Sequence, residues 1–247
     1  MIKKNMVDLT GKEIIITGGA KRIGRHLALA AARAGASVII HYGQSEREAV
    51  QLADEIARMG VKAHLFQADF ADPAASLSAF QDLLEKHENL FGLVNNASIF
   101  EPLKFMETSL ESWQAHLDVN LTVPFLFSQA FARALGSKPG RIINLLDWRA
   151  LRPGKDHFPY TISKAALAAM TQMLANILAP NIQVNGLALG AILPPSDGNA
   201  SDAIIQNVPA ARWASMDELN DTFLFLLTGP DYITGEIIHL DGGRHLV

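Results

Sequence analysis

Three residues past the middle of the chain have types and spacing suited to proton transfer. Tyr160 and Lys164 are four positions apart, so on a helix their side chains face the same side. A tyrosine hydroxyl has a pKa of about 10, and a nearby ammonium group favours its ionised form, which helps it to exchange a proton at neutral pH. Asp147 precedes the tyrosine by thirteen positions. We take Asp147, Tyr160 and Lys164 as candidate catalytic residues.

The carboxylate at position 147 restricts the chemistry that this group can perform. A serine hydroxyl there would suit a carbonyl substrate, because it donates to the oxygen on which negative charge develops. A carboxylate would repel that charge, and it suits a substrate that presents N–H donors and is protonated at nitrogen. Structural interpretations remain open. The Tyr-x-x-x-Lys pair can lie on a half-buried helix face, and Asp147 can anchor its own loop by pairing with Arg149 or Arg152.

A glycine-rich turn near the start of the chain is suited to binding a dinucleotide. The stretch "IIITGGAKRIG", residues 14–24, places the turn between an apolar strand and a helix, where backbone N–H groups hold a pyrophosphate. In NAD-binding folds an acidic residue about 20 positions further on holds the ribose 2′-hydroxyl. In this chain no acidic residue lies between Gly24 and Glu46. Lys21, Arg22 and Ser45 are instead placed to meet a 2′-phosphate. We expect NADPH, with a solvated Lys21–Arg22 pair as the alternative.

Short apolar runs alternate with helical segments along the whole chain. This alternation predicts βαβ units that form an α/β fold with a doubly wound (Rossmann) seven-stranded parallel sheet, in a single domain spanning 1–247. Ser109–Leu135 is long for one crossover and predicts two helices, the second interrupted near Pro124. The expected strands are Glu13–Thr17, Ser37–Tyr42, Ala63–Gln67, Gly92–Asn95, Arg141–Leu145, Ile182–Leu187 and Glu236–Leu240, and the other expected helices are Arg22–Ala34, Ser45–Met59, Ala74–His87 and Tyr160–Ala179.

Composition excludes several other classes of protein. The formal net charge of −4 and the pI of about 6.0 show no basic excess, so a nucleic-acid groove or an anionic membrane surface is not expected. Cysteine is absent, which removes disulfides, thiolate metal sites and thiol catalysis. The eight histidines show no paired spacing, so no metal site is expected. Without a secretory signal or a long apolar run, we predict a cytoplasmic protein.

The short motifs of the chain match those of one known family. Residues 17–24 fit a Thr-Gly-x-x-x-Gly-x-Gly turn with Arg22 at the middle glycine, and "NNAS" at 95–98 fits Asn-Asn-Ala-Gly. With Asn120 and the Tyr-x-x-x-Lys pair, the chain resembles the short-chain dehydrogenase/reductase family over essentially its whole length. The resemblance implies that Asn120 holds a water in the proton relay and that Lys164 also binds the nicotinamide ribose. The expected cofactor-binding residues are Gly18, Lys21, Arg22, Ile23, Gly24, Tyr42, Ser45, Asp69, Asn96, Ala97, Tyr160, Lys164 and Gly190.

The departures from the general pattern resemble the pteridine reductase and dihydromonapterin reductase branch. They are Arg22, Ser98, Asp147 and the ending "LDGGRHL". The resemblance implies NADPH-dependent reduction of a dihydropterin or dihydrofolate, in which Asp147 and Tyr160 deliver a proton to nitrogen. It also implies that Phe100 stacks on the pterin ring. The expected substrate-binding residues are Ser98, Phe100, Asp147 and Tyr160.

Several of these assignments have simpler alternatives. Phe100 can be a packing residue and Ser98 a turn residue. Asp69, which the resemblance places at the adenine amino group, can cap a turn or helix. Arg244 and His245 either border the pocket of a neighbouring subunit or form a frayed end.

Three functions therefore remain open at the level of sequence. The first is the reduced-pterin or folate reductase, with a small-molecule substrate, a substrate loop around 190–215 and the homotetramer that is usual in the family. The second is a carbonyl or 3-oxoacyl reductase that tolerates Asp147. The third is an NADPH-binding regulatory protein without turnover, which would have no need of Tyr160, Lys164 and Asn120.

Overall fold

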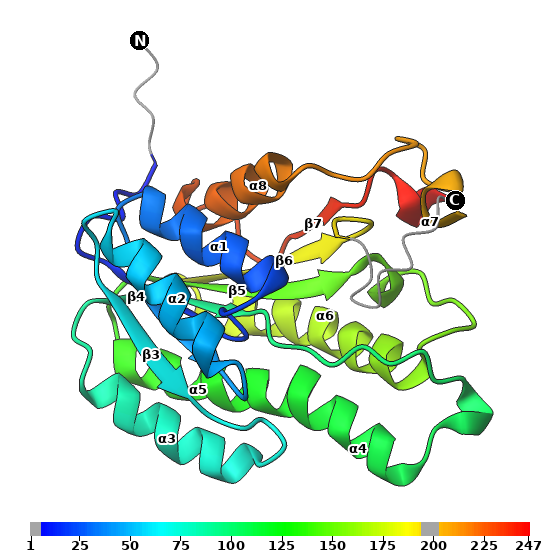
Figure 1. The fold of residues 1–247 in the computed structure, drawn as a ribbon, viewed down its shortest axis with the longest axis horizontal. Helices are drawn as coiled ribbons and strands as arrows, with labels where there is room; N and C mark the ends of the chain where they lie inside the picture. Colours follow the sequence, from blue (N-terminus) through cyan, green and yellow to red (C-terminus); the bar gives the residue numbers. More distant parts are fainter. Residues whose placement is uncertain (1–5, 194–202) are drawn as a thin grey trace.

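The protein forms a single seven-stranded parallel sheet with helices on both faces (Figure 1). The computed structural model describes residues 6–193 and 203–247. The strand order is β3-β2-β1-β4-β5-β6-β7, and every neighbouring pair is parallel, as a doubly wound sheet requires. The strands are β1 (Glu13–Ile16), β2 (Ser37–Tyr42), β3 (Ala63–Gln67), β4 (Leu90–Asn95), β5 (Gly140–Asp147), β6 (Ile182–Leu189) and β7 (Ile237–Leu240).

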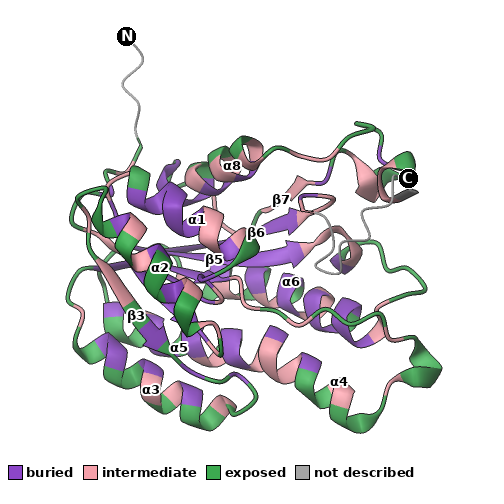
Figure 2. Ribbon diagram, in the orientation of Figure 1, coloured by how far each residue is buried: buried purple, intermediate pink, exposed green. Residues whose placement is uncertain are grey.

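Two helical layers enclose the sheet, because its central strands are apolar on both faces (Figure 2). One layer holds α1 (Arg22–Arg33), α2 (Glu46–Ala57) and α8 (Met216–Thr228). The other holds α3 (Pro73–Glu85), α4 (Leu110–Leu117), α5 (Val123–Leu135) and α6 (Phe158–Leu178). A short helix α7 (Ala203–Gln206) and 3₁₀ turns at Phe105–Glu107, Trp148–Ala150 and Arg244–Leu246 complete the described elements. No helix in the described ranges is long and apolar enough to cross a membrane.

All seven expected strands form, and the differences lie at their ends. β5 extends to Asp147, two residues beyond the expected end at Leu145, so the candidate carboxylate is the last residue of a strand. The segment Ser109–Leu135 holds two helices as expected, but the predicted interruption near Pro124 is wrong. Pro124 lies in the first turn of α5, where a missing N–H costs nothing, and the irregularity before it is a π-helical turn at Asp118–Thr122.

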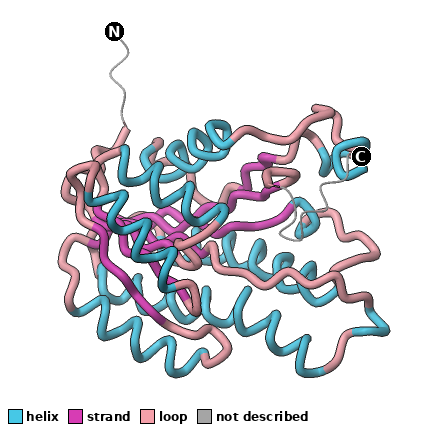
Figure 3. Tube along the Cα trace, in the orientation of Figure 1, coloured by secondary structure: helices cyan, strands magenta, loops and turns pink. Residues whose placement is uncertain are grey.

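The strand order reverses between β1 and β4, so the connections leaving these two strands run to opposite sides. Ligands bind at this point of the carboxyl edge in folds of this kind. The loops that follow β4 and β5 gather at this edge (Figure 3).

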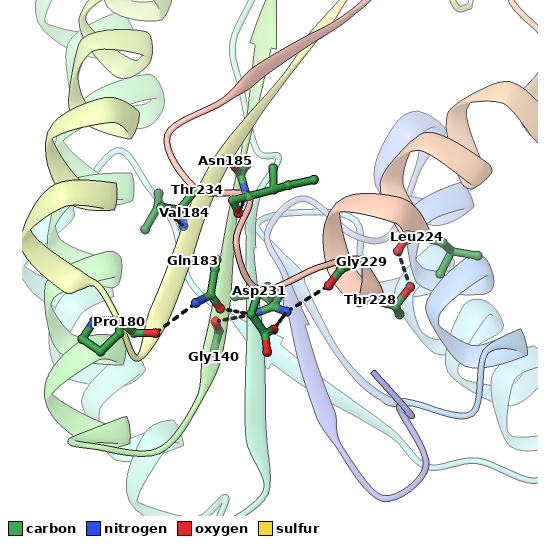
Figure 4. A network of polar contacts seen from close by, with 12 residues as sticks. Gly140, Pro180, Gln183, Val184, Asn185, Leu224, Thr228, Gly229, Asp231 and Thr234 are labelled. Carbon is green, nitrogen blue, oxygen red and sulfur yellow. Dashed lines mark hydrogen bonds and ion pairs between the residues drawn. The ribbon is translucent and has the colours of Figure 1, made fainter. Parts of the chain in front are cut away.

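The opposite, amino edge is held by a buried arginine. Arg141, near the start of β5, is only 2% exposed and pairs with Asp231 and with the side chain of Gln183. Its guanidinium also donates to the Gly229 carbonyl at 3.3 Å, and Gln183 in turn donates to the Pro180 carbonyl at 3.0 Å (Figure 4). These bonds join β5 and β6 to the α8–β7 connection and so hold this edge of the sheet together.

Candidate active site

The predicted catalytic pair and the aspartate meet at the carboxyl edge. Asp147 ends β5, and Tyr160 lies in the first turn of α6, where its hydroxyl donates to Asp147 Oδ2 at 3.3 Å. Lys164, one turn further along α6, donates from Nζ to the Leu145 carbonyl at 2.7 Å. Its ammonium lies 5.8 Å from the Tyr160 ring centroid. Strand and helix thus bring together three residues that the sequence separates by up to seventeen positions.

Burial determines how two of these groups hold their protons. The pKa of Tyr160 is raised well above its usual 10.0, first by desolvation and then by the negative charge of Asp147. Desolvation lowers the pKa of Lys164 from 10.5 to about 8, and the Asp147 charge opposes part of that shift. In the protein without ligand, Tyr160 is therefore a firmly protonated donor rather than a tyrosinate.

The Asp147 carboxylate serves the loop as well as the tyrosine. Its Oδ1 accepts from the Arg149 backbone N–H at 2.8 Å, and the Arg149 guanidinium lies 3.5 Å from the same oxygen. Arg149 also donates to Asp156 at 3.2 Å. The predicted proton-transfer contact and the alternative loop anchor are thus both present, one on each oxygen. Arg152, the other expected partner, instead donates to the Arg244 carbonyl at 3.3 Å.

Asn120 is fully buried in the π-helical turn and connects the loop after β4 to α6. Its Oδ1 accepts from the Ile99 N–H and from the Ser98 hydroxyl, each at 3.0 Å. Its Nδ2 donates to the Ile99 carbonyl at 3.1 Å and to Ser163 Oγ at 3.0 Å. The wide turn aims the side chain out of the regular helical register, and turns of this type are frequent at functional sites. Ser163 in turn donates to the Tyr160 carbonyl, so a chain of two hydrogen bonds links Asn120 to the backbone of Tyr160.

The glycine-rich turn is shaped for close approach of the backbone to a ligand. A Cβ at Gly24 would lie 2.2 Å from the Gly18 carbonyl oxygen, so α1 can begin against the turn only with glycine there. Gly18 has a φ of +59°. Asn96 donates from Nδ2 to the Thr17 carbonyl at 2.7 Å, and Thr17 Oγ1 accepts from the Ala97 N–H at 3.0 Å. This tight cradle at a helix N-terminus fits a pyrophosphate.

A histidine on β2 that the sequence analysis did not select holds the same glycine-rich turn in place. His41, on β2, accepts the Gly18 N–H at Nδ1 with a distance of 2.9 Å, and its Nε2 lies 3.1 Å from the Ala68 carbonyl. Desolvation lowers the pKa of His41 to about 4, so the ring is neutral and Nε2–H is the donor. The only sequence signal was a polar residue in an apolar strand, "VIIHY".

The expected 2′-phosphate residues cluster where β2 meets the turn. Lys21 forms an ion pair with Glu48 at 2.9 Å, and both side chains are about half exposed. Arg22 has a φ of +49°, a conformation that glycine adopts without strain, at the position where the family pattern has glycine. Ser45 is the N-cap residue of α2, and Tyr42 is buried at the end of β2.

Three other predicted cofactor residues follow β3, follow β6 or lie at the start of α1. Asp69 accepts the Ala71 N–H at 3.0 Å, so its carboxylate forms the turn that was its alternative reading. Gly190 follows β6 so closely to Asp241 that a Cβ would lie 2.6 Å from the Asp241 Cα. Ile23 packs at the start of α1 against the core.

Phe100 lies at the mouth of the site. Its ring stacks on His157 at 4.0 Å between centroids and meets the Tyr160 ring edge-on at 4.7 Å. The side chain is nevertheless 52% exposed. His157, which the sequence analysis missed, occupies one face, and the Arg149 guanidinium lies 5.8 Å from the ring centroid.

The C-terminal tail reaches this mouth within the same chain. Arg244 lies 4.6 Å from the Trp148 ring centroid and Arg149 lies 4.8 Å from it, so both guanidinium groups lie against the indole. His245 is held by Asp241 at 2.8 Å. The tail is thus ordered, not frayed. Of the predicted substrate loop around 190–215, residues 194–202 lie outside the described residues.

Hydride chemistry needs a bound dinucleotide on one side of the substrate and a proton donor on the other, and this edge provides for both. Fold and site together define the class: a nicotinamide-dependent oxidoreductase.

Known proteins place the chain more closely. A family model described as enoyl-(acyl carrier protein) reductase matches residues 18–245. The chain therefore belongs to this family of short-chain dehydrogenases/reductases. The 3-oxoacyl-[acyl-carrier-protein] reductase of Synechocystis sp. is 34% identical to it over 243 residues, which cover 96% of this chain and 98% of the relative.

Two similar solved structures contain the expected dinucleotide. FolM alternative dihydrofolate reductase 1 from Brucella canis, complexed with NADP, has a TM-score of 0.89 and 31% identity over 98% of this chain and 97% of that one. A gluconate 5-dehydrogenase from Burkholderia cenocepacia, in complex with NADP and tartrate, has a TM-score of 0.88 and 30% identity over 97% of each chain. The predicted fold, family and NADP-type cofactor are confirmed. The named substrates of the relatives divide between folate and carbonyl compounds.

Proposed function

We propose that the protein is an NADPH-dependent reductase that converts a dihydropterin or dihydrofolate to the tetrahydro form. The observation that carries the proposal is the Tyr160 hydroxyl donating to the Asp147 carboxylate at 3.3 Å. This carboxylate replaces the neutral donor that a developing alkoxide requires. It also raises the pKa of Tyr160, so the tyrosine stays protonated until a more basic atom takes its proton. A ring nitrogen that gains electrons as its C=N bond is reduced is such an atom.

The catalytic residues then have separate tasks. When bound, NADPH supplies the hydride to carbon. Tyr160 gives its proton to the substrate nitrogen, and the Asp147 carboxylate then takes a proton from water and passes it to the tyrosine oxygen that it already contacts. The Lys164 ammonium stabilises the transient negative charge on Tyr160 and reaches the nicotinamide ribose. Asn120 holds a water in the relay, as the family resemblance implies.

The cofactor fits the glycine turn described above. We propose that the backbone N–H groups of Ile23 and Gly24 hold the pyrophosphate at the N-terminus of α1, beside Gly18, whose own N–H donates to His41, with Asn96 and Ala97 fixing the turn. The 2′-phosphate is met by Lys21, Arg22 and Ser45, while Tyr42, Asp69 and Gly190 border the adenine and nicotinamide ends.

The substrate enters between the nicotinamide and Phe100. The exposed part of this phenyl ring stacks on the flat pterin, beside the His157 ring and the Arg149 guanidinium. Ser98, held by Asn120, lies beside the ring and offers its hydroxyl. The segment around 190–215 is the proposed substrate loop. We also infer that the protein is a cytoplasmic homotetramer. The molar mass of the purified protein, measured by size-exclusion chromatography with light scattering, tests the tetramer.

A carbonyl or 3-oxoacyl reductase is the second candidate, and the 34% identity to a 3-oxoacyl-[acyl-carrier-protein] reductase favours it. In that case Asp147 is a tolerated substitution whose main task is to anchor Arg149. A regulatory protein without turnover is the third reading, and the assembled Tyr160–Lys164–Asn120 set argues against it.

NADPH consumption measured on parallel substrates separates these functions. We expect turnover with dihydrobiopterin, dihydromonapterin or dihydrofolate, and none with a simple ketone or a 3-oxoacyl thioester. Turnover of the carbonyl compounds alone would establish the second candidate, and binding of NADPH without any turnover the third.

Matched variants of Asp147 show what the carboxylate contributes. Asp147→Asn keeps the shape and the contact to the Arg149 N–H but cannot relay a proton, so dihydropterin turnover falls by about 100-fold. Asp147→Ser loses the same activity and gains ketone turnover. If Asp147→Ser keeps wild-type dihydropterin turnover, the proton-relay role is wrong.

A further inference from the structure

Among the described residues, one group of side chains away from the active site combines donors typical of a transition-metal site. Glu13, His64 and His87 each offer one donor atom, and these atoms lie within 4.8 Å of one another. They come from the first residue of β1, from β3 and from the connection between α3 and β4. These three residues are far apart in the sequence and show no motif spacing, so the sequence did not predict a metal site.

The backbone around this group is rigid. The Glu13 N–H donates to the Asn89 carbonyl at 2.9 Å, and the Asn89 N–H donates to Glu13 Oε2 at 3.3 Å. The other carboxylate oxygen lies 2.8 Å from His87 Nδ1. The side chains of Glu13 and His87 are only 13% and 9% exposed. This arrangement orients the carboxylate without an ion and leaves it little freedom to lose on binding one.

His64 completes the third side. Its ring lies edge-on to that of His87, with 4.8 Å between centroids. Burial, followed by the neighbouring His87, lowers the pKa of His64, and the Glu13 charge opposes part of that shift. Lys62 also lowers the pKa of His64, and its charge opposes a bound cation.

We propose that Glu13, His64 and His87 form a zinc-type divalent metal site that clips β1, β3 and the α3–β4 connection together at the amino edge. Two imidazoles and one carboxylate are a common zinc ligand set, with a water in the fourth position. Zinc–ligand bonds of about 2.0–2.2 Å place ligand atoms about 3.3 Å apart, so the widest separation would shorten by about 1.5 Å or less, and a zinc ion would replace the 2.8 Å hydrogen bond between His87 and Glu13. Imidazole donors favour Zn²⁺ or Co²⁺ over Mg²⁺.

Zinc content and thermal stability of the whole, untagged protein test this site. We expect about one equivalent of Zn²⁺ after dialysis and a Tm increase of about 5 °C at 100 times Kd, with no increase from Mg²⁺. His64→Gln and His87→Gln weaken zinc binding at least about 10-fold, and Lys62→Gln strengthens it. Cobalt adds a visible spectrum that reports the ligands directly.

A control histidine distinguishes this site from adventitious binding. His26→Gln changes a histidine on α1 outside the group and should leave zinc binding and the Tm increase intact. Equal loss in His26→Gln and His87→Gln, or unchanged zinc binding in His64→Gln and His87→Gln, would overturn the proposal. NADPH turnover lies at the other edge and is not used as the readout.

Discussion

The two edges of the sheet treat charged groups in opposite ways. At the carboxyl edge, Lys164 is buried with one carbonyl as partner and a pKa lowered to about 8. At the amino edge, the equally buried Arg141 has a carboxylate, an amide and a backbone carbonyl as partners. Both charges were removed from water, but only Arg141 has its donors well used. The carboxyl edge therefore holds reactive groups at a cost in folding stability, whereas the amino edge contributes to that stability.

The largest effect is expected at the tyrosine. Tyr160→Phe removes the transferable proton while keeping the ring, so turnover falls by about 10²–10⁴-fold. The free energy of unfolding should hardly change, because the lost partner contact is a 3.3 Å hydrogen bond. Steady-state kinetics and urea unfolding measure the two quantities. A variant that retains half of the wild-type turnover would remove Tyr160 from the mechanism.

The reverse pattern is expected at the amino edge. Arg141→Met leaves the partners of the guanidinium without their donor and lowers the free energy of unfolding by about 3 kcal/mol. Turnover at 25 °C, measured on the folded fraction, stays within about twofold. Arg133→Met, an exposed arginine on α5, is the control and should change stability by less than about 0.5 kcal/mol. An equally small change in both variants would contradict the contrast.

Lys164 provides a pH-dependent version of the same contrast. Its pKa is about 8 in the folded protein and 10.5 in the unfolded chain, so between these values the unfolded chain binds more protons and stability rises with pH. Lys164→Met should therefore stabilise the ligand-free protein by about 1–3 kcal/mol at pH 7, since each factor of ten in proton affinity is worth about 1.4 kcal/mol.

This gain should fade as the pH rises from 8 to 10.5, while turnover is lost at every pH. Denaturant unfolding at pH 7 and at pH 10 tests the sign. A loss of stability at pH 7 would mean that the bond to the Leu145 carbonyl outweighs the burial of the charge.

A smaller effect is expected at the cofactor turn. Arg22→Gly supplies the residue that suits a φ of +49° but removes a cation from the proposed 2′-phosphate pocket. The KM for NADPH should rise about 10-fold, or about 1.4 kcal/mol, and the KM for NADH should not. Parallel titrations with both dinucleotides measure this, and an equal rise for both would assign Arg22 to the turn alone.

The smallest effect is expected at the mouth of the site. Phe100→Leu keeps apolar volume but removes the stacking surface, so the KM for the dihydropterin rises about fivefold. His157→Asn exposes the covered face of the same ring and serves as the comparison. An unchanged KM in Phe100→Leu would return Phe100 to a packing role.

Sequence patterns predicted the local and repetitive features well. Apolar runs predicted all seven strands, the glycine turn lies between a strand and a helix as expected, and the Tyr-x-x-x-Lys pair lies on a helix. Features that depend on distant residues were missed. The role of His41 follows from its hydrogen bond with the Gly18 N–H, which the sequence does not show. In the same way, the sequence does not show that His157 stacks on one face of Phe100. Pro124 was read as a break because the π-helical turn before it has no sequence signature.

That turn also bears on how the chain can be edited. Asp118–Thr122 contains one residue more than a regular helix needs. Deleting a residue there would let α4 and α5 join as one helix, so chain continuity would survive the change. The wide turn already takes up the extra residue, so α4 and α5 would keep nearly their present orientation, while the side chains within the turn would return to the regular helical register. Such a shortened protein would remain helical but misplace Asn120. Insertions and deletions at this point would therefore leave the helix content unchanged and abolish activity.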